Sequence, residues 1–395
     1  MYISSKRRLR GLLLAALLLS ASAWAQSPPK PYAEIDPNAV TYSGPGRTAA
    51  DDLPGEKIRV GMLAAITGPR KAEGEALIHA AQMAIEDDNA DTLPDGRRLV
   101  LVRRDENGLW GRASSEIVQM VFDDQVVAIV TSEDGGAAHL AEQVGNKIGV
   151  PILSLSTDPT TTEINLPWIF RIGPTDATQA RLFARSIYHD RGLHRVLLIT
   201  ATDHDGRMGA EEFLKAARGL GAPLPIRIGV GQQLNNAAEI AEQIPEAEAL
   251  VLWTGPEIAT RVVAKVREAG ASLPVYLCRK AAQGSFEELR SSACRTCSDK
   301  PVGFWTVASR EANTAARKTF ADRYQKQFGS APTLASAQAY DAVRVLAAAL
   351  RRSGPNRARL RDALADVTEF PGVSGTISFD HAGNDTTQAA LVRVY

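Results

Sequence analysis

Short apolar runs alternate with amphipathic helical patterns along most of the chain, and this alternation constrains the fold more than any other feature. The first apolar run, Ile58–Ile66, has the nearly unbroken hydrophobicity of a strand that is buried on both faces. It is followed by Thr67-Gly68-Pro69, and from Gly74 onward the apolar residues take the spacing of a helix. Strands that alternate with helices at this spacing predict an α/β fold, with parallel sheets covered by helices on both faces.

The alternation runs through two successive series, which predicts two lobes. A chain of 395 residues is long enough to bury two cores. After the first strand we expect strands at Leu99–Val102, Val126–Val130, Val150–Leu155, Val196–Thr200, Ile226–Val230, Ala249–Trp253 and Val275–Cys278, and edge strands at Gly375–Phe379 and Ala390–Val394. We expect helices at Ser114–Phe122, Ala137–Ile148, Ala177–Arg191, Met208–Leu220, Ala237–Ile244, Glu257–Ala269, Ala312–Phe328 and Ser336–Arg352.

The N-terminus predicts export. Four basic residues within positions 6–10 precede the apolar run Leu12–Leu19 and the small-residue pattern Ala23-Trp24-Ala25. This is the pattern of a cleavable signal peptide, so we expect residues 1–25 to be removed and a Pro- and Gly-rich arm to follow over residues 26–56. No later stretch approaches ~18 uninterrupted apolar residues, so we expect a soluble periplasmic protein without stable membrane insertion.

Charge and cysteine content argue against nucleic-acid binding and against a zinc site. The chain holds 45 basic and 45 acidic residues, and loss of the signal peptide leaves a slight acidic excess, which argues against nucleic-acid binding. We expect Cys294 and Cys297 to form a small local disulfide, with a redox pair as the alternative, and Cys278 to be a buried thiol. Three cysteines without a nearby histidine pair do not make a zinc site, so we expect no metal.

The order of the motifs resembles that of the type I periplasmic binding proteins, in the branch of leucine/isoleucine/valine-binding receptors of ABC importers. The similarity lies in the strand and Thr67-Gly68-Pro69 loop, then Asp105-Glu106, then the polar loops Thr131–Gly136 and Ser154–Pro159. It continues at the C-terminal end in Ala339–Ala342 and Gly372–Asp380 and covers nearly the whole chain from Ile58.

The resemblance implies two doubly wound parallel-sheet lobes joined by three hinge crossings, near Gly173–Thr175, Val307–Ser309 and Phe370–Val373. Lobe 1 would comprise residues 57–174 plus 309–371, and lobe 2 residues 175–308 plus 372–395. Two such lobes would close a small-molecule ligand in the cleft between their strand ends and deliver it to the permease subunits of an ABC transporter.

The resemblance also implies ligand-binding residues on lobe 1. The family's serine-bearing loop falls on residues 132–135, with Gly135 where a serine usually stands, and its next loop offers hydroxyls. Glu73 stands at an aromatic position of the family, and Trp110 is a candidate for the rim. The predicted residues are Glu73, Trp110, Ser132, Glu133, Asp134, Gly135, Ser154, Ser156 and Thr157.

On lobe 2 the sequence departs from the family. Asp205 stands at the position of a tyrosine, and Arg279-Lys280 stand near the acidic residue that would receive a ligand ammonium. A basic residue at that position favours an anionic ligand group where the family's acidic residue favours a cationic one. We therefore expect a small polar ligand that bears a carboxylate or other anionic group. The predicted residues are Asp203, Asp205, Trp253, Thr254, Arg279 and Lys280.

Each candidate has a structural alternative. Residues 203–205 are also suited to capping the next helix, and the two basic residues to a solvated loop. Trp110 and Trp253 are also suited to core packing, and Glu73 to the rim or the start of a helix.

The same sequence leaves other functional classes open. A ligand sensor of the same fold would signal through a separate partner, and Glu133, Asp134, Asp203 and Asp205 would be the carboxylates of a hydrolase. Because the chain lacks a G-x-S-x-G turn, an H-E-x-x-H motif and a phosphate-binding G-x-x-x-x-G-K-[ST] loop, we expect a binding protein rather than an enzyme, without a cofactor.

Overall fold

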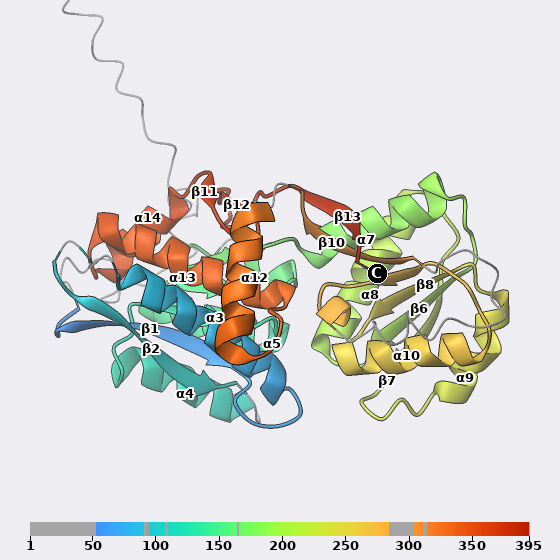
Figure 1. The fold of residues 1–395 in the computed structure, drawn as a ribbon, viewed down its shortest axis with the longest axis horizontal. Coiled ribbons are helices and arrows are strands. Elements are labelled where there is room, and N and C mark those ends of the chain that lie inside the picture. The colour runs from blue at the N-terminus through green and yellow to red at the C-terminus, as the bar shows by residue number, and fades with distance from the viewer. Residues whose placement is uncertain are drawn as a thin grey trace, which may run out of the picture.

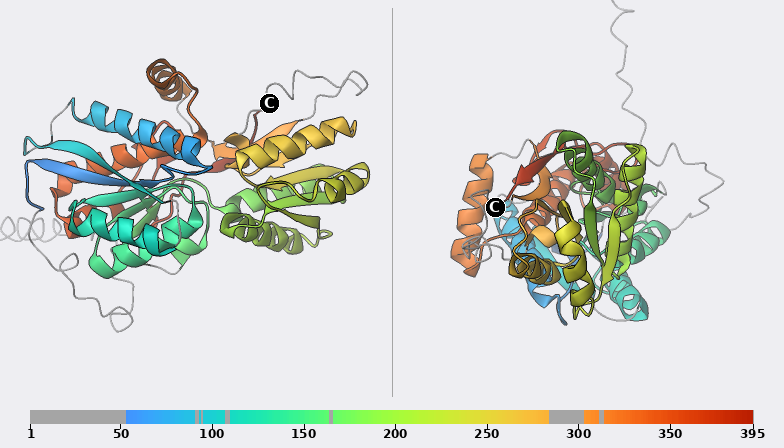
Figure 2. Two further views of the ribbon diagram at one scale, coloured as in Figure 1. Left: turned by 90° about the horizontal axis from the view of Figure 1, so that it is seen from below. Right: turned by 90° about the vertical axis from the view of Figure 1, so that its right-hand side faces the viewer.

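Two sheets, each with its own helices, lie side by side in the computed structural model (Figure 1). The structure describes residues 53–90, 93, 95–106, 110–163, 166–283, 303–310 and 314–394. We call the five-stranded sheet of β1–β5 with its helices the first half, and the six-stranded sheet of β6–β10 and β13 with its helices the second half. Figure 2 shows helices on both faces of each sheet, so the predicted α/β fold is confirmed.

The first half is built on a fully parallel sheet with the order β2-β1-β3-β4-β5. Helix α13 packs along α3 on one face, and α4 and α5 cover the other. The strands are β1 (Lys57–Ala64), β2 (Arg98–Asp105), β3 (Ala128–Thr131), β4 (Ile152–Ser154) and β5 (Ile169–Arg171). The helices are α3 (Lys71–Asp88), α4 (Trp110–Phe122), α5 (Gly135–Ile148), α6 (Thr160–Glu163), α12 (Thr314–Phe328), α13 (Leu334–Ser353) and α14 (Arg357–Ala365).

The second half has the strand order β13-β10-β9-β8-β6-β7, and only its edge strand β13 runs antiparallel to its neighbour. Its strands are β6 (Val196–Ala201), β7 (Ile226–Val230), β8 (Ala249–Trp253), β9 (Val275–Leu277), β10 (Phe304–Ser309) and β13 (Ala389–Arg393). Its helices are α7 (Asp176–Ala184), which continues as π-helix over Arg185–Asp190, α8 (His204–Gly219), α9 (Ala237–Gln243) and α10 (Pro256–Glu268). Short 3₁₀ turns cover Ile244–Glu246 and Ala281–Gln283, and β11 (Phe370–Pro371) pairs with β12 (Thr376–Ile377) as a separate ribbon.

Strand β1 shows how the sequence builds the first core. Met62 packs into the cluster between the sheet and α3, whereas Leu63 packs into the cluster on the α4 and α5 face. Successive side chains of a strand point to opposite faces, so a run of apolar residues buries both faces of the sheet. The prediction of a doubly buried first strand is therefore confirmed.

A glycine near the start of a helix brings α3 and α8 close to the strand that precedes each of them. A Cβ atom on Gly74 would lie 1.9 Å from the carbonyl oxygen of Ala65, and one on Gly206 would lie 2.2 Å from that of Ala201. Only glycine permits such a close backbone approach. Both halves thus hold the first turn of a helix against a strand end, where unpaired helix N–H groups face a shared space.

The C-terminal segment packs partly on each half. Val373, Ile377 and Phe379 belong to the first hydrophobic core, whereas Ala389 and Leu391 pack against the second. The predicted lobe boundaries stay predictions, and this packing favours a third crossing later in the chain than residues 370–373.

Besides the short 3₁₀ turns, five elements are missing from the sequence prediction: α6, β5, β10, α14 and β11. The segment Val307–Ser309, predicted as a hinge crossing, ends strand β10, which pairs with β9 and β13. Among the described residues no helix is long and apolar enough to cross a membrane. The predicted signal peptide and all but the last few residues of the predicted arm lie outside the described residues.

Candidate functional site

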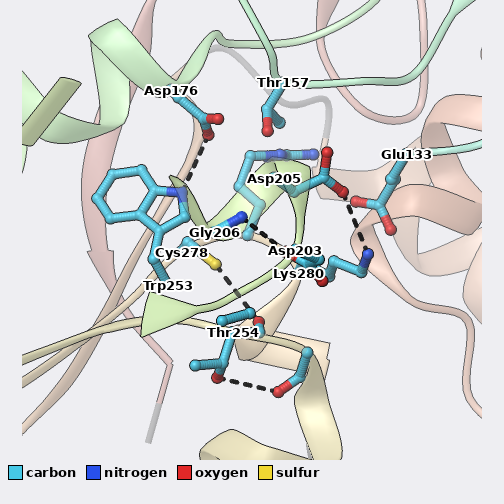
Figure 3. A pocket seen from close by; sticks show the side chains of 13 residues that line it. Glu133, Thr157, Asp176, Asp203, Asp205, Gly206, Trp253, Thr254, Cys278 and Lys280 are labelled. Atoms are coloured by element: carbon cyan, nitrogen blue, oxygen red, sulfur yellow. Dashed lines mark hydrogen bonds and ion pairs between the residues drawn. The ribbon is translucent and has the colours of Figure 1, made fainter. Parts of the chain in front are cut away.

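A pocket lies between the two halves, at the carboxyl ends of strands from both sheets (Figure 3). It encloses about 410 Å³, part of which is open to solvent. The first half contributes the loops after β3 and β4, and the second half contributes the start of α7 and the loops after β6, β8 and β9. The lining residues are Glu133, Thr157, Asp176, Ala201, Asp203, Asp205, Gly206, Trp253, Thr254, Gly255, Cys278, Arg279 and Lys280.

The structure brings eight of the fifteen predicted residues to this pocket: Glu133, Thr157, Asp203, Asp205, Trp253, Thr254, Arg279 and Lys280. The sequence prediction missed five lining residues: Asp176, Ala201, Gly206, Gly255 and Cys278. Six predicted residues do not line it: Glu73, Ser132, Asp134, Gly135, Ser154 and Ser156. Trp110 begins α4, and its side chain lies outside the described residues. The predicted roles of all fifteen in ligand binding stay predictions.

Arg279 is the buried cation of the pocket wall. It follows the end of β9, and only 4% of the residue is exposed. Its main-chain N–H donates to the Gln179 side chain and its Nη1 donates to the Val307 carbonyl oxygen at 3.0 Å. Its Nε has no hydrogen-bond partner, and no ion pair to it is found among the described residues. Burial lowers the pKa of the Arg279 guanidinium to about 10.

Lys280, the next residue, is paired within the second half. Its Nζ lies 3.4 Å from the Asp205 carboxylate. Burial disfavours the charge on Lys280, but the carboxylates of Asp205 and Glu73 outweigh it, so the pKa of Lys280 is raised. The adjacent basic residues therefore differ: Lys280 has a carboxylate at ion-pair distance, whereas the carboxylates of Glu133 and Asp385 act on Arg279 only from farther away.

Asp176 is the buried acid of the pocket. Its Oδ1 accepts hydrogen bonds from Trp253 Nε1 at 3.3 Å and from Gln179 Nε2 at 2.9 Å. Burial outweighs these bonds and raises the pKa of the Asp176 carboxyl to about 7. Trp253 is 3% exposed and packs edge-on against Phe183. Trp253 is therefore a core residue that contributes to the pocket wall rather than an exposed stacking face.

In the first half, the loop after β3 is held by a buried acid. Ser132 Oγ donates to Glu106 Oε2 at 2.5 Å, and Arg70 lies 3.2 Å from Glu106 and 3.0 Å from Asp134. Burial raises the pKa of Glu106 to about 7 despite the Arg70 charge. Asp134 also caps α5 by accepting from the Ala137 N–H. Both predicted residues, Ser132 and Asp134, thus have their polar atoms occupied within the first half.

The hydroxyls of the next loop are also used by the chain itself. Ser154 Oγ accepts from the Ser156 N–H and from Thr131 Oγ1, each at 3.2 Å. Ser156 Oγ accepts from the Asp158 N–H at 3.2 Å. These bonds shape the loop and leave Thr157 as its lining residue.

Direct hydrogen bonds join the two halves beside the pocket. Gln283 Nε2 donates to Glu133 Oε2 at 2.7 Å, and the Gly135 N–H donates to Asp205 Oδ1 at 3.0 Å. A Cβ atom on Gly135 would lie 2.7 Å from that same Asp205 oxygen. The glycine at the usual serine position therefore allows the second half to approach α5 closely.

Two histidines and an aspartate meet at another contact between the halves. Nε2 of His204, at the start of α8, lies 2.6 Å from Asp158 Oδ2, and Nε2 of His139, on α5, lies 3.2 Å from the same oxygen. Hydrogen bonds to Asp158 and Glu142 raise the pKa of His139 to about 9. The three ligand-capable atoms lie within 4.8 Å of one another, so this is a group that could hold a metal ion. The sequence prediction missed it because the three residues are far apart in the chain.

The sequence profile of the periplasmic binding protein family matches residues 57–394, which is nearly all of the described chain. The chain belongs to the periplasmic binding protein family. The family predicted from the order of the motifs is therefore confirmed. The location of the pocket at the facing strand ends of both halves agrees with this assignment.

Solved structures of other family members have the same fold. A leucine-binding protein from Thermotoga maritima is 19% identical, with a TM-score of 0.73 over 85% of this chain and 95% of that one. A solute-binding protein of an ABC transporter from Rhodopseudomonas palustris, solved with 3,4-dihydroxybenzoic acid, is 18% identical, with a TM-score of 0.74 over 86% and 94%. A branched-chain amino acid transporter protein from Streptococcus pneumoniae, solved with isoleucine, is 21% identical, with a TM-score of 0.71 over 86% and 100%. At these identities the similarity establishes the fold of this periplasmic binding protein.

Plant receptors contain related segments. Glutamate receptor 3.4 of Arabidopsis thaliana is 30% identical over 138 residues, which is 34% of this chain and 14% of the receptor. Glutamate receptor 2.2 of the same plant is 22% identical over 285 residues, which is 70% of this chain and 30% of the receptor. This periplasmic binding protein thus spans less than a third of either receptor.

The cysteines divide between described and undescribed parts of the chain. Cys278 is a buried free thiol, as predicted, and burial raises its pKa to about 12. Cys294 and Cys297 lie outside the described residues, so their disulfide stays a prediction.

Proposed function

We propose that this protein captures a small molecule bearing a carboxylate in the pocket between its halves and delivers it to the permease subunits of an ABC importer. The observation that carries the proposal is Arg279, a buried cation on the pocket wall with an unpaired Nε and no ion pair among the described residues. The proposed location is the periplasm, after removal of residues 1–25. N-terminal sequencing of the exported protein tests that cleavage.

The unpaired state of Arg279 is energetically costly. A guanidinium that is removed from water without a counterion costs several kcal/mol, unless an anion with suitable hydrogen-bonding geometry offsets the loss. Arg279 also presents a planar set of donors that matches a carboxylate. A ligand carboxylate in the pocket would therefore gain a charge-assisted contact that the chain itself does not supply.

The remaining lining residues favour a small polar ligand rather than an apolar one. Asp176 and Glu133 lie on the same pocket and would accept donors from the ligand, including an ammonium. An amino acid and an aromatic acid are therefore both reasonable members of the ligand class.

Hinge closure would couple capture to delivery. The contacts from Gly135 to Asp205 and from Glu133 to Gln283 form only where the halves meet. A ligand that touches both halves binds the closed arrangement better than an open one and so shifts the population toward it. The permease would then recognise the closed form. The solved relatives from Streptococcus pneumoniae and Rhodopseudomonas palustris, which their titles assign to transporters, support this part of the proposal.

Isothermal titration calorimetry on the purified mature chain tests the ligand class. The panel comprises benzoate, 3,4-dihydroxybenzoate, leucine, isoleucine and glutamate, each beside its primary amide. We expect at least one carboxylate to bind, its amide to fail, and Arg279→Gln to weaken binding by about 100-fold, because charged contacts of this kind contribute about 2–5 kcal/mol. The matched control is Arg185→Gln, since Arg185 is exposed on the outside of the second half. Binding of the amide as tight as that of the acid would contradict the proposal.

A ligand sensor remains the second candidate, because the plant glutamate receptors contain segments similar to this chain. Sensing and import need the same pocket and differ in the partner. Uptake of the radiolabelled ligand into vesicles that carry the cognate permease separates them, since a sensor would not drive uptake.

The hydrolase alternative is also tested with the panel. Glu133, Asp203 and Asp205 line the pocket, whereas Asp134 is bound to Arg70 and to the N-terminus of α5. Incubation of the protein with each bound compound, followed by mass spectrometry, should recover the compound unchanged if the protein only binds it.

A further inference from the structure

We propose that His139, His204 and Asp158 form a zinc site that joins the two halves of the molecule at the edge of the ligand pocket. His139 and Asp158 belong to the first half and His204 to the second. The flanking residues Thr157, Asp203 and Asp205 line the pocket, so the zinc site and the pocket share two loops. The site is separate from the pocket, because none of its three ligands lines it.

One pair of donor atoms has the spacing that zinc requires, and the other pairs must adjust on binding. Tetrahedral zinc with bonds of about 2.0–2.2 Å places its ligand atoms about 3.3 Å apart. His139 Nε2 lies 3.2 Å from Asp158 Oδ2, and all three donor atoms lie within 4.8 Å of one another. His204 Nε2 lies only 2.6 Å from the same oxygen and must move back by a few tenths of an ångström. His204 has room for this, because its side chain is 38% exposed and it is the first residue of its helix.

Glu142 gives the site the support that metal-bound histidines usually have. Its Oε2 lies 3.2 Å from His139 Nδ1, and its side chain is 1% exposed. Both Glu142 oxygens are otherwise without a hydrogen bond among the described residues, so His139 is the close partner of a fully buried acid. A carboxylate on the far nitrogen of a metal-binding imidazole fixes the ring and the tautomer that presents Nε2 to the metal.

The local charge and access also suit a cation. The buried carboxylates of Asp158 and Glu142 both contact His139, and Asp158 also contacts His204. Arg171 is a buried cation close to Asp158, and its Nη1 donates to the main-chain carbonyl of Asp158 rather than to the carboxylate. Thr160 Oγ1 bonds to Asp158 Oδ1 at 2.7 Å and lies 3.0 Å from His139 Nε2. The threonine hydroxyl must therefore turn toward Asp158 alone, and water would complete the coordination from the exposed side.

Two imidazoles and one carboxylate select the metal class. Imidazole nitrogen favours zinc and other late first-row ions over magnesium or calcium, which prefer oxygen ligands. Since the ligands come from both halves, bound zinc stabilises the closed arrangement directly. Zinc and the pocket ligand then favour the same state, so each should tighten the binding of the other. This coupling rests on the proposed function, whereas the zinc site itself does not.

The test uses the full mature chain, stripped of metal with a chelator, and zinc chloride as the probe. Competition against a chromophoric chelator gives the zinc affinity, and small-angle scattering gives the radius of gyration with and without zinc. We expect one zinc per chain at this site and a smaller radius of gyration when zinc is present. His139→Gln and His204→Gln should each weaken zinc binding at least about tenfold, and Glu142→Gln by about 10–100-fold. Magnesium chloride should not bind.

The controls separate this site from other ligands in the chain. His189→Gln removes an exposed histidine of the second half and should leave zinc binding unchanged. Cys294→Ser with Cys297→Ser should also leave it unchanged. Zinc binding that depends on the cysteines, or that survives His204→Gln, would overturn the bridging site. So would the absence of zinc binding to the wild-type chain.

The ligand panel is then repeated with and without one equivalent of zinc. A carboxylate that binds more tightly with zinc supports the coupling. Zinc binding in a chain to which no carboxylate binds would leave the zinc site intact while contradicting the proposed function. Carboxylate binding without zinc binding would support the proposed function and contradict the zinc site.

Discussion

The polar groups on the two sides of the pocket, which we call the first wall (from the first half) and the second wall (from the second half), differ in how far the chain itself satisfies them. On the first half, Ser132, Ser154 and Ser156 bond to neighbouring groups of their own wall. On the second half, Arg279 keeps an unpaired Nε, and Asp176 has its pKa raised to about 7 by burial. The serine hydroxyls of the first wall are thus used by the chain itself, whereas the second wall carries groups whose charge the chain only partly compensates.

This difference indicates which wall sets the shape of the pocket and which wall selects the ligand. Saturated loops hold their shape without a ligand, and shape is what positions the closing surface at Gly135 and Thr157. Groups that are held in an unfavourable environment gain most when a ligand of the right charge arrives. We therefore infer that the second wall selects the ligand and that the first wall sets the geometry of closure.

The largest expected effect concerns Asp176. Its folded-state pKa of about 7 lies above that of an exposed aspartate, so the folded chain binds the proton more tightly than the unfolded chain. The stabilisation is complete below about pH 4 and is lost as pH rises through about 7, by at most about 4 kcal/mol. Asp176→Asn removes this loss, so its stability relative to wild type should rise between pH 4 and 7 and then level off.

Urea unfolding of both proteins across this pH range measures that difference. Asp322→Asn on the exposed face of α12 controls for the loss of one negative charge. A constant difference between Asp176→Asn and wild type at all pH values would show that Asp176 is not the strained acid of the second wall.

The next effect concerns Arg279 without any ligand. Replacing a buried charge by an apolar side chain of similar length removes its desolvation cost, so Arg279→Met should stabilise the ligand-free chain by about 1–3 kcal/mol. The same variant should lose the thermal shift caused by any carboxylate that stabilises wild type. Stability and recognition would then trade off at one residue. A ligand-free variant that is less stable than wild type would instead make Arg279 a structural residue, and the two walls would no longer differ.

How far the sequence predicted this site depends on the kind of signal. Residues that follow apolar strands could be located, because the strand ends are visible in the hydrophobic pattern. Glu133, Asp205 and Arg279 were predicted from the family resemblance, in loops that follow such strands, and all line the pocket. Asp176 follows no long apolar strand, since it comes after the three-residue strand β5 and the turn at Pro174. No periodic signal marks such a position.

The serine loops show the other kind of failure, in which predicted residues do not line the pocket. Ser154 and Ser156 were predicted to bind the ligand and do not line the pocket, because a hydroxyl can bond to its own backbone as readily as to a ligand. Sequence alone does not distinguish these partners. The helix α14 was missed although it begins with a recognisable cap, since Asn356 accepts from the Arg359 N–H. The meeting of His139, Asp158 and His204 depends on the placement of two halves, which no local pattern encodes.

A smaller effect separates closure from recognition. Gly135→Ala places a methyl group 2.7 Å from Asp205 Oδ1 and 2.9 Å from the His204 ring, so the halves must separate slightly. Overpacking of this kind costs about 1–3 kcal/mol. Because the methyl group lies at the contact between the halves, it should destabilise the closed arrangement rather than either hydrophobic core. Gly136→Ala is the matched control, because its methyl group would approach only the Asp134 side chain, at 3.2 Å. We expect a larger radius of gyration for Gly135→Ala alone, and equal values for both variants would contradict the contact.

The smallest expected effect concerns Ser156 on the first wall, and it tests most directly whether only the second wall selects the ligand. Ser156→Ala removes the acceptor of the Asp158 N–H, which should cost about 0.5–1.5 kcal/mol of stability. Because the hydroxyl is already used by the chain, affinity for a panel carboxylate should change by less than about threefold, or under 1 kcal/mol. Thr157→Ala, one residue along, removes a side chain that lines the pocket and should weaken binding more. If Ser156→Ala weakened binding as much as Thr157→Ala, the first wall would also select the ligand, and the division of tasks between the walls would fail.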